Sequence, residues 1–345
     1  MSEWTGLLES LIAIPSLSRE EGPAVDFLQK WMSARGHVVR RTGNNLWCES
    51  EPPYGKPTVL LNAHIDTVKP SSGYTRDPFS PTREGDRIYG LGSNDDGGSL
   101  VSLLAAYEIL SGKEQPYRLI YSATAQEEVS GREGIELIFP ETGPVAFGII
   151  GEPTRMEMAI SEKGLMVLDC TAFGKSGHAA REEGVNAIYA AMEDIDWFRH
   201  FNGRVSPLLG PVRMSVTVIG AGDQHNVVPD RCRFVVDVRP NGLYTNEELL
   251  GLIRANVRSE VVPRSTRLQG TTISEDHPAV IRGKQLGLKS FGSPTLSNRA
   301  LCPFPCIKIG PGDSARSHTA DEFICVSELE DAVGIYVKLL DGLEI

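Results

Sequence analysis

The sequence predicts an α/β protein that carries a second, smaller α+β domain as an insertion. Apolar runs ending in polar residues occur at 58–66, 117–128 and 145–153 and alternate with helical segments. Such runs are typical of buried parallel strands, and their alternation with helices predicts a mostly parallel sheet with helices on both faces. From about residue 161 to 271 the pattern changes to a period of two, which indicates an antiparallel sheet with one solvated face.

Each element follows from its local pattern. Apolar residues at helical spacing predict helices at 5–14 and 23–35, and a Thr-Gly-Asn turn predicts a hairpin of 38–41 with 45–50. The larger domain is expected to contain four further elements: helices at 97–110, 277–290 and 327–341 and a strand at 306–310. The insertion is expected to contain strands at 162–174, 212–222 and 231–240 and helices at 185–199 and 246–257. We therefore expect a discontinuous domain of residues 1–160 and 272–345 and an inserted domain of residues 161–271.

Composition excludes several classes of protein. The 345 residues suggest two domains, and 41% hydrophobic with 23% charged residues is typical of a globular enzyme. A formal charge of −11 disfavours nucleic-acid binding. No stretch approaches the ~18 apolar residues of a membrane span, and the N-terminal segment with Glu3 and Glu9 does not resemble a secretory signal. We expect a cytoplasmic protein with reduced cysteines and neither membrane nor nucleic-acid partners.

Metal-type ligands stand at the ends of the predicted strands or in the loops after them. These candidates are His64, Asp95, Glu128, Glu152 and His318. Because the carboxyl ends of strands in an open α/β sheet meet at one crevice, we expect these side chains to lie close together. Imidazole and carboxylate ligands suit Zn²⁺, and less specifically Mn²⁺ or Co²⁺.

Charge counting favours two metal ions. Two Zn²⁺ ions would be balanced by the carboxylates of Asp95, Glu128 and Glu152 together with a bridging hydroxide, while the two histidines stay neutral. A single ion would leave these carboxylates repelling one another. A carboxylate that bridges the pair should hold the ions ~3.5 Å apart.

Three carboxylates beside these ligands have other expected roles. Glu127 can reach the site from the strand end without being a ligand, and could carry a proton from metal-bound water to a leaving amine. Asp66 lies two residues after His64 and could accept its N–H, which would fix the tautomer of the ring. Asp96 is expected only to cap the following helix.

Five motifs, in this order, cover nearly the whole chain. They are HID (64–66), GSNDDGG (92–98), QEE (126–128), GEPT (151–154) and HTADE (318–322). Together they resemble the acetylornithine deacetylase, succinyl-diaminopimelate desuccinylase and carboxypeptidase G family of dinuclear zinc amidohydrolases. Two positions depart from the family's pattern: many relatives carry Arg in place of Leu91 and Lys in place of Gly97. Neither position is a metal ligand, so the departure affects the expected entrance of the site and not the expected ligands.

The resemblance implies a role for each candidate. His64, Asp95 and Glu152 would hold one zinc, and the shared Asp95 with Glu128 and His318 would hold the other. Glu127 would be the general base and Asp66 would support His64. The inserted domain would be a lid through which two copies form a homodimer.

Three positions of the insertion match substrate-facing residues of the family. His178, in GKSGHAA, resembles a histidine that crosses the dimer to polarise the scissile carbonyl. Asn226, in HNVVPD, and Arg239, in DVRP, resemble residues that hold the substrate carboxylate, for which a guanidinium is well suited. The simpler alternatives are a turn residue for His178 and, for Arg239, an ion pair with Asp237 or Asp230.

The resemblance implies a hydrolase that uses water to cleave the amide of a small N-acylated amino acid. GPGDSARSHTADE is most similar to the acetylornithine deacetylase branch, which serves arginine biosynthesis. The alternatives among hydrolases are a desuccinylase of succinyl-ornithine or succinyl-diaminopimelate and a dinuclear zinc dipeptidase or carboxypeptidase. A non-catalytic metal-binding protein on this fold is expected to lack Glu127 or a ligand, and none is missing. The sequence contains no GxSxG, HExxH or P-loop motif, so other hydrolase classes lack support.

Overall fold

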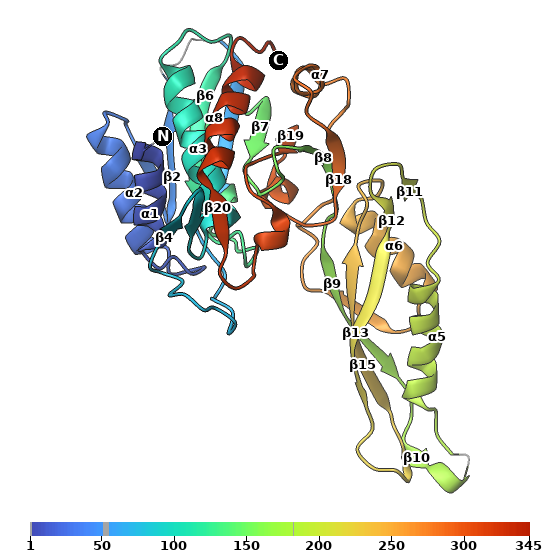
Figure 1. Ribbon diagram of the computed structural model, residues 1–345. Coiled ribbons are helices and arrows are strands. Elements are labelled where there is room, and N and C mark those ends of the chain that lie inside the picture. Colours follow the sequence, from blue (N-terminus) through green and yellow to red (C-terminus); the bar gives the residue numbers. More distant parts are fainter. Residues whose placement is uncertain (1, 51–54, 182) are drawn as a thin grey trace. The chain divides into compact units, whose positions relative to one another are not determined.

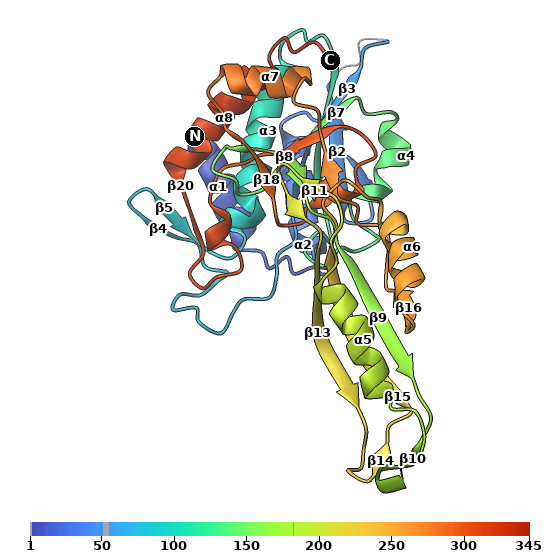
Figure 2. The same cartoon turned by 90° about the vertical axis from the view of Figure 1, so that its right-hand side faces the viewer.

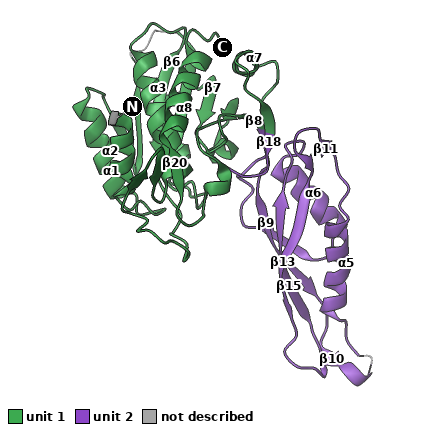
Figure 3. Ribbon diagram, in the orientation of Figure 1, with its two compact units in different colours: residues 1–160, 273–291, 297–345 green, residues 161–272, 292–296 purple. Residues whose placement is uncertain are grey.

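The chain divides into two compact units, which are coloured separately in Figure 3. The computed structural model describes residues 2–50, 55–181 and 183–345. Unit 1 comprises residues 1–160, 273–291 and 297–345, and unit 2 comprises residues 161–272 and 292–296. Residues 292–296 were expected in the larger domain. They group with unit 2 because Gly292 lies against Leu208 and the Ser293 carbonyl accepts the Lys163 N–H at 3.1 Å.

Unit 1 is built on a sheet whose four central strands are parallel. In spatial order these are β6 (Arg118–Thr124), β3 (Thr58–His64), β7 (Phe147–Ile150) and β19 (Cys306–Lys308). β1 (Arg40–Thr42) and β2 (Asn45–Glu49) flank them on one side and β8 (Met158–Glu162) on the other, all antiparallel to their neighbours. β17 (Thr271–Thr272) and β18 (Ser290–Ser293) pair with β8. The predicted α/β class with a mostly parallel central sheet is confirmed.

Both faces of this sheet are buried, which explains the continuous apolar runs. Val59 and Leu61 of β3 pack into a core between the sheet and its main helices, whereas Leu60 packs into a second core on the opposite face of the sheet. The helices packed into the first core are α1 (Ser2–Ile12), α2 (Gly22–Ala34), α3 (Gly98–Ser111), α7 (Pro278–Gln285) and α8 (Val326–Leu340). Figure 1 shows α3 and α8 side by side, in agreement with their packing. The second face is covered by a short 3₁₀ turn (Ile135–Leu137) and α4 (Phe139–Thr142).

A small three-stranded sheet in unit 1 was not predicted. It consists of β4 (Thr82–Glu84), β5 (Arg87–Tyr89) and β20 (Phe323–Cys325). β20 begins directly after the HTADE motif, so this sheet anchors the segment that carries His318. The predicted helix at 277–290 is also shorter than expected, because Gly287 turns the chain at φ +83° and residues 290–293 form a strand.

Unit 2 has a four-stranded antiparallel sheet with two helices on one face. The strand order is β13 (Arg213–Ala221), β15 (Arg231–Arg239), β9 (Met166–Phe173) and β16 (Glu260–Pro263). The buried side chains of β9 and β15 alternate with exposed ones and pack against α5 (Ala187–Arg199) and α6 (Asn246–Asn256). Two short pairs complete the unit: β10 (Gly177–His178) with β14 (Val227–Val228), and β11 (Val205–Ser206) with β12 (Gly210–Pro211). Figure 2 shows β10 and β14 at the end of the unit remote from β11.

None of the helices in the described part of the chain combines the length and the apolar character needed to cross a membrane.

Candidate metal centre

His64 is the last residue of β3, and its ring is held in one orientation. The residue is 2% exposed, and Nδ1 lies 2.8 Å from the main-chain oxygen of Asp66. Because a carbonyl oxygen can only accept, Nδ1 carries the proton and Nε2 faces Asp95 Oδ1 at 3.0 Å. The Asp66 carboxylate was expected to accept this proton, but it lies 3.6 Å away. The main chain of Asp66 therefore fixes the tautomer.

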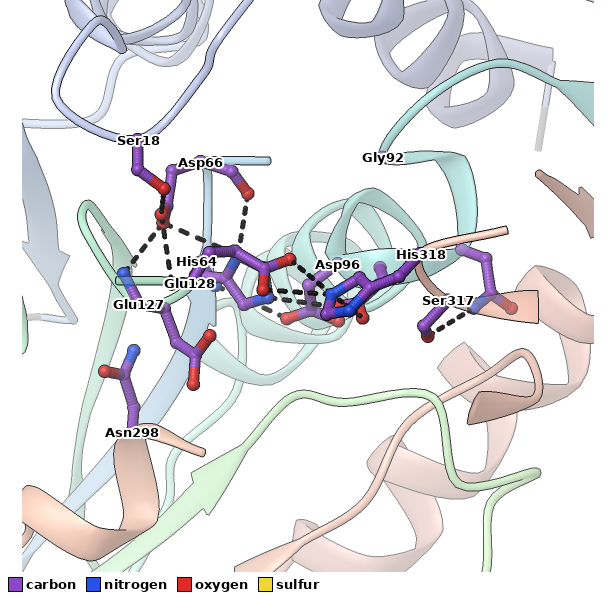
Figure 4. A network of polar contacts seen from close by, with 12 residues as sticks. Ser18, His64, Asp66, Gly92, Asp96, Glu127, Glu128, Asn298, Ser317 and His318 are labelled. Atoms are coloured by element: carbon purple, nitrogen blue, oxygen red, sulfur yellow. Dashed lines mark hydrogen bonds and ion pairs between the residues drawn. The ribbon is translucent and has the colours of Figure 1, made fainter. Parts of the chain in front are cut away.

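The Asp66 carboxylate instead organises the Glu127–Glu128 turn. Oδ1 accepts the Glu127 N–H at 3.0 Å, while Oδ2 accepts the Glu128 N–H at 3.2 Å and the Ser18 hydroxyl at 2.7 Å. Burial alone would raise the pKa of Asp66, but the neighbouring His64 and these hydrogen bonds hold it below its ordinary value. The two glutamates that follow β6 are thus fixed by the segment that follows β3, as Figure 4 shows.

Asp95 lies between the two histidines, with one carboxylate oxygen toward each. His64 Nε2 approaches Oδ1 at 3.0 Å, and His318 Nε2 lies 3.7 Å from Oδ2. His318 Nε2 also contacts the two carboxylate oxygens of Glu128 at 3.1 and 3.0 Å. The hydrogen bond to Glu128 raises the pKa of His318 to about 9. Asp95 is therefore close to both histidines, and Glu128 is close to His318.

The remaining carboxylates crowd around His64. Two sets of three residues bring their ligand atoms within 4.8 Å of one another: His64, Glu127 and Glu152, and His64, Asp95 and Glu128. Burial raises the pKa of both Glu127 and Glu152 well above the ordinary value, and neighbouring carboxylates add to it. Nitrogen and oxygen ligands with an excess of negative charge fit divalent cations, which would relieve the repulsion. The described residues therefore contain candidate metal-ligand groups.

Asp96 does not cap α3 as expected. Asp95 and Asp96 have non-helical φ angles of −122° and −126°, and α3 begins at Gly98, where the N-cap is Gly97 and no side chain caps the helix. The kink turns the Asp96 carboxylate beneath β3, where Oδ2 accepts the His64 N–H at 3.3 Å. Oδ1 is buried without a hydrogen-bond partner among the described residues, and burial raises the pKa of Asp96 to about 8.

Two residues that contact the ligand-bearing segments were missed in the sequence. Glu322 is 2% exposed and accepts main-chain N–H groups of the segment that carries Asp95. Asn94 links that segment to the one that precedes His318. Glu322 is the last residue of the HTADE motif, and this position was the only hint of a role in the site. Because it follows Asp321, it resembles an ordinary solvent-exposed acidic residue in the sequence.

The three expected substrate-facing residues belong to unit 2. β10 pairs with β14, and the Ala179 N–H donates to the Asn226 carbonyl at 3.1 Å, so His178 and Asn226 lie near each other. His178 is exposed, and its Nδ1 accepts the Ala180 N–H at 3.1 Å. Arg239 makes two hydrogen bonds to the Asp237 carboxylate, at 2.7 and 3.1 Å, which is the simpler alternative that the sequence allowed.

Comparison with known proteins gives one family match within the chain and relatives that cover most of it. Residues 160–265 match the M20 peptidase dimerisation domain. The acetylornithine deacetylase of Proteus mirabilis is 26% identical over 97% of this chain and 95% of the relative, and that of Pectobacterium carotovorum is 29% identical over 92% of each. Among solved structures, the aminopeptidase PepT of Bacillus cereus has a TM-score of 0.79 at 20% identity and covers 98% of this chain and 97% of its own. A dinuclear metal-binding M20 peptidase of Bacillus subtilis has a TM-score of 0.75 at 15% identity, covering 98% and 97%.

The acetylornithine deacetylases and M20 peptidases among these matches confirm the prediction of a hydrolase that acts on amide bonds. The resemblance indicated by the five motifs is also confirmed. The chain is similar to the M20 amidohydrolases, and its sequence is similar to acetylornithine deacetylases.

Proposed function

We propose that this chain is a metal-dependent deacylase that hydrolyses the amide of an N-acylated amino acid, with N-acetyl-ornithine as the expected substrate. The observation that carries the proposal is the position of Asp95, whose two carboxylate oxygens face His64 and His318. The acetylornithine deacetylases among the relatives support the choice of acyl group and amino acid.

Five residues would hold two divalent ions, with Zn²⁺ as the expected metal and Co²⁺ or Mn²⁺ as alternatives. His64, Asp95 and Glu152 would hold one ion, and Asp95, Glu128 and His318 the other. When bound, the ions would polarise the amide carbonyl and activate water.

Glu127 is the proposed proton carrier. It lies within reach of His64 and Glu152, and its main-chain N–H is fixed by Asp66. As water adds to the carbonyl carbon, the Glu127 carboxylate takes one of its protons. Glu127 then donates this proton to the amide nitrogen as the C–N bond breaks, which releases a carboxylic acid and an amine.

Unit 2 is proposed to supply substrate contacts. Because His178 Nδ1 accepts the Ala180 N–H, the neutral ring keeps its proton on Nε2, where it can donate to the oxygen of the scissile carbonyl. Asn226 and Arg239 are proposed to hold the substrate carboxylate. For Arg239, the substrate would have to displace Asp237 from both hydrogen bonds.

We propose that unit 2 also forms a homodimer, which the match to the M20 peptidase dimerisation domain supports. β13 is an edge strand of its sheet, and unpaired sheet edges favour pairing with another chain. Val218 and Ile219 on this strand are 59% and 56% exposed, and Tyr189 and Met192 on α5 are 68% and 57% exposed. Apolar side chains gathered on such an edge suit a second copy of the same surface.

The test is hydrolysis by the purified protein loaded with Zn²⁺ or Co²⁺. N-acetyl-ornithine, N-succinyl-ornithine and a dipeptide should be compared at equal concentration. We expect N-acetyl-ornithine to be cleaved fastest and the Glu127→Gln variant, at equal metal content, to be almost inactive. Faster cleavage of the succinyl compound or the dipeptide would replace the proposed substrate. Binding of two ions without hydrolysis of any amide would refute the proposal.

A further inference from the structure

Asp95 lies in a kinked π-helical turn rather than in a strand or an α-helix. Residues 93–97 lie between β5 and α3, and Asp95 and Asp96 depart from helical geometry. A bridging ligand must nevertheless be held firmly, because ligand geometry determines metal affinity. The question is therefore which contacts fix this segment.

Glu322 supplies the first set of contacts. Its Oε1 accepts the N–H groups of Asn94 and Asp95 at 2.9 and 2.8 Å, and Oε2 accepts the Gly92 N–H at 3.0 Å. Hydrogen bonds to an ionised acceptor are stronger than neutral ones. The main chain of Glu322 is itself fixed, because its carbonyl accepts the Gly90 N–H at 3.0 Å and β20 begins at the next residue.

Asn94 supplies the reciprocal contacts. Its Oδ1 accepts the Asp313 N–H at 3.0 Å, and its Nδ2 donates to the Asp313 carbonyl at 3.1 Å and to Ser317 Oγ at 3.2 Å. Close approach is possible because residue 312 is glycine, where an added Cβ would lie 2.3 Å from Asn94 Oδ1. Figure 4 shows Ser317 next to His318, so Asn94 reaches the segment immediately before that ligand.

These contacts join two segments that are more than 200 residues apart in sequence. One carries Asp95 and the other carries His318, and each segment contributes a side chain that binds the main chain of the other. We propose that Glu322 and Asn94 act as a clasp that positions Asp95 against His318, and that the clasp sets the affinity for the second of two divalent ions. This inference rests on the two-ion site of the proposed function.

The carboxylate of Glu322 is required for this role because its partners are three donors. Glutamine has the same shape, but one of its two terminal atoms would be an NH₂ group that faces main-chain N–H groups. Glu322→Gln should therefore loosen the segment around Asp95 while leaving both ligands in the chain. Asn94→Ala removes the reciprocal contacts without adding bulk or charge.

A matched control exists in unit 2. Asp194 is 4% exposed and accepts the N–H groups of Arg258 and Ser259 together with the Ser259 hydroxyl. Asp194→Asn should lower the free energy of unfolding, as the clasp variants do, but should not change ion binding. It separates a general loss of stability from a loss of ligand positioning.

The experiment is calorimetric titration of each full-length variant with Zn²⁺ and with Co²⁺, with elemental analysis after dialysis. We expect the parent protein and Asp194→Asn to bind two ions. We expect Glu322→Gln and Asn94→Ala to keep the first, and the affinity for the second to fall roughly 10- to 100-fold. Excess Zn²⁺ or Co²⁺ should then restore turnover in both clasp variants.

Folded Glu322→Gln that binds both ions with parental affinity would overturn the clasp. If Glu322→Gln does not fold, Asn94→Ala provides the same test. Parental affinity for both ions in Asn94→Ala would then overturn the clasp. A similar loss of ion affinity in Asp194→Asn would also overturn it. A parent protein that binds fewer than two ions would instead refute the two-ion site itself, and a parent that binds two but cleaves nothing would refute only the proposed reaction.

Discussion

Asp66→Asn tests whether the Asp66 carboxylate positions the two glutamates of the site. The change keeps the shape of the side chain but replaces one acceptor oxygen with an NH₂ group. Because the two oxygens accept the N–H groups of Glu127 and Glu128 separately, either orientation of the amide leaves one partly buried N–H unpaired. An unpaired buried donor costs about 1–3 kcal/mol, and weaker bonds to a neutral acceptor add ~1 kcal/mol. The free energy of unfolding should therefore fall by roughly 2–4 kcal/mol.

Ser18→Ala is the matched control for this prediction. It removes the hydroxyl bond to Asp66 Oδ2 but leaves both main-chain N–H bonds, so the loss of stability should be ~1 kcal/mol. Turnover should fall by about 10²-fold in Asp66→Asn, since misplacement of a catalytic group by ~1 Å has that effect, and should remain near the parental value in Ser18→Ala. Urea denaturation with chelator present gives the stability, and turnover is measured at equal metal content. Parental turnover in Asp66→Asn, or an equal loss in Ser18→Ala, would refute the reasoning.

Three further predictions concern the proton carrier, the lid and a helix cap. Glu127→Gln should retain metal but lower turnover by roughly 10²–10⁴-fold, whereas Glu128→Gln should lose metal by elemental analysis. Mixing the slowed His178→Ala and Glu127→Gln subunits should restore activity if His178 acts across a dimer. No recovery would show that His178 acts in its own chain or has no role in turnover. Burial lowers the pKa of His277 from its ordinary value of 6.5, and its Nδ1 accepts the Ala279 N–H at the start of α7. The unfolded chain therefore binds the proton first, and the stability that is present above pH 6.5 should decline as the pH falls through 6.5 toward the lowered pKa. His277→Asn should abolish this part of the decline in urea melts.

The elements that could be predicted from the sequence are those whose own pattern is strong. The apolar run ending at His64 corresponds to β3, and the glycine-opened apolar segment corresponds to α3. The strands of the small sheet could not be predicted, because β4, β5 and β20 have three residues each and form only by pairing across distant parts of the chain. The end of α7 was predicted too late because it depends on the left-handed conformation of Gly287, which the spacing of apolar residues does not predict.

Predicting the site met a similar limit. Spacing and strand ends were enough to bring His64, Asp95 and Glu128 together as candidates, and the structure places their ligand atoms within 4.8 Å of one another. The role of Asp96 was misjudged because it depends on a kink before α3 rather than on residue type. The role of Glu322 depends on its burial against residues 92–94, which are distant in the sequence. The sequence around Glu322 does not predict this burial.

Unit 1 is discontinuous in the sequence, and this has a consequence for synthesis on the ribosome. Nearly all of unit 2 is continuous in sequence and ends at Thr272, whereas the central strand β19 and the ligand His318 come later. The 46 residues from Thr272 to His318 take roughly 2–9 s to make at ~5–20 residues per second. During that interval the nascent chain holds a nearly complete unit 2 and a sheet that still lacks β19. If unit 2 forms the proposed homodimer, nascent chains on neighbouring ribosomes can meet through it before either has made His318.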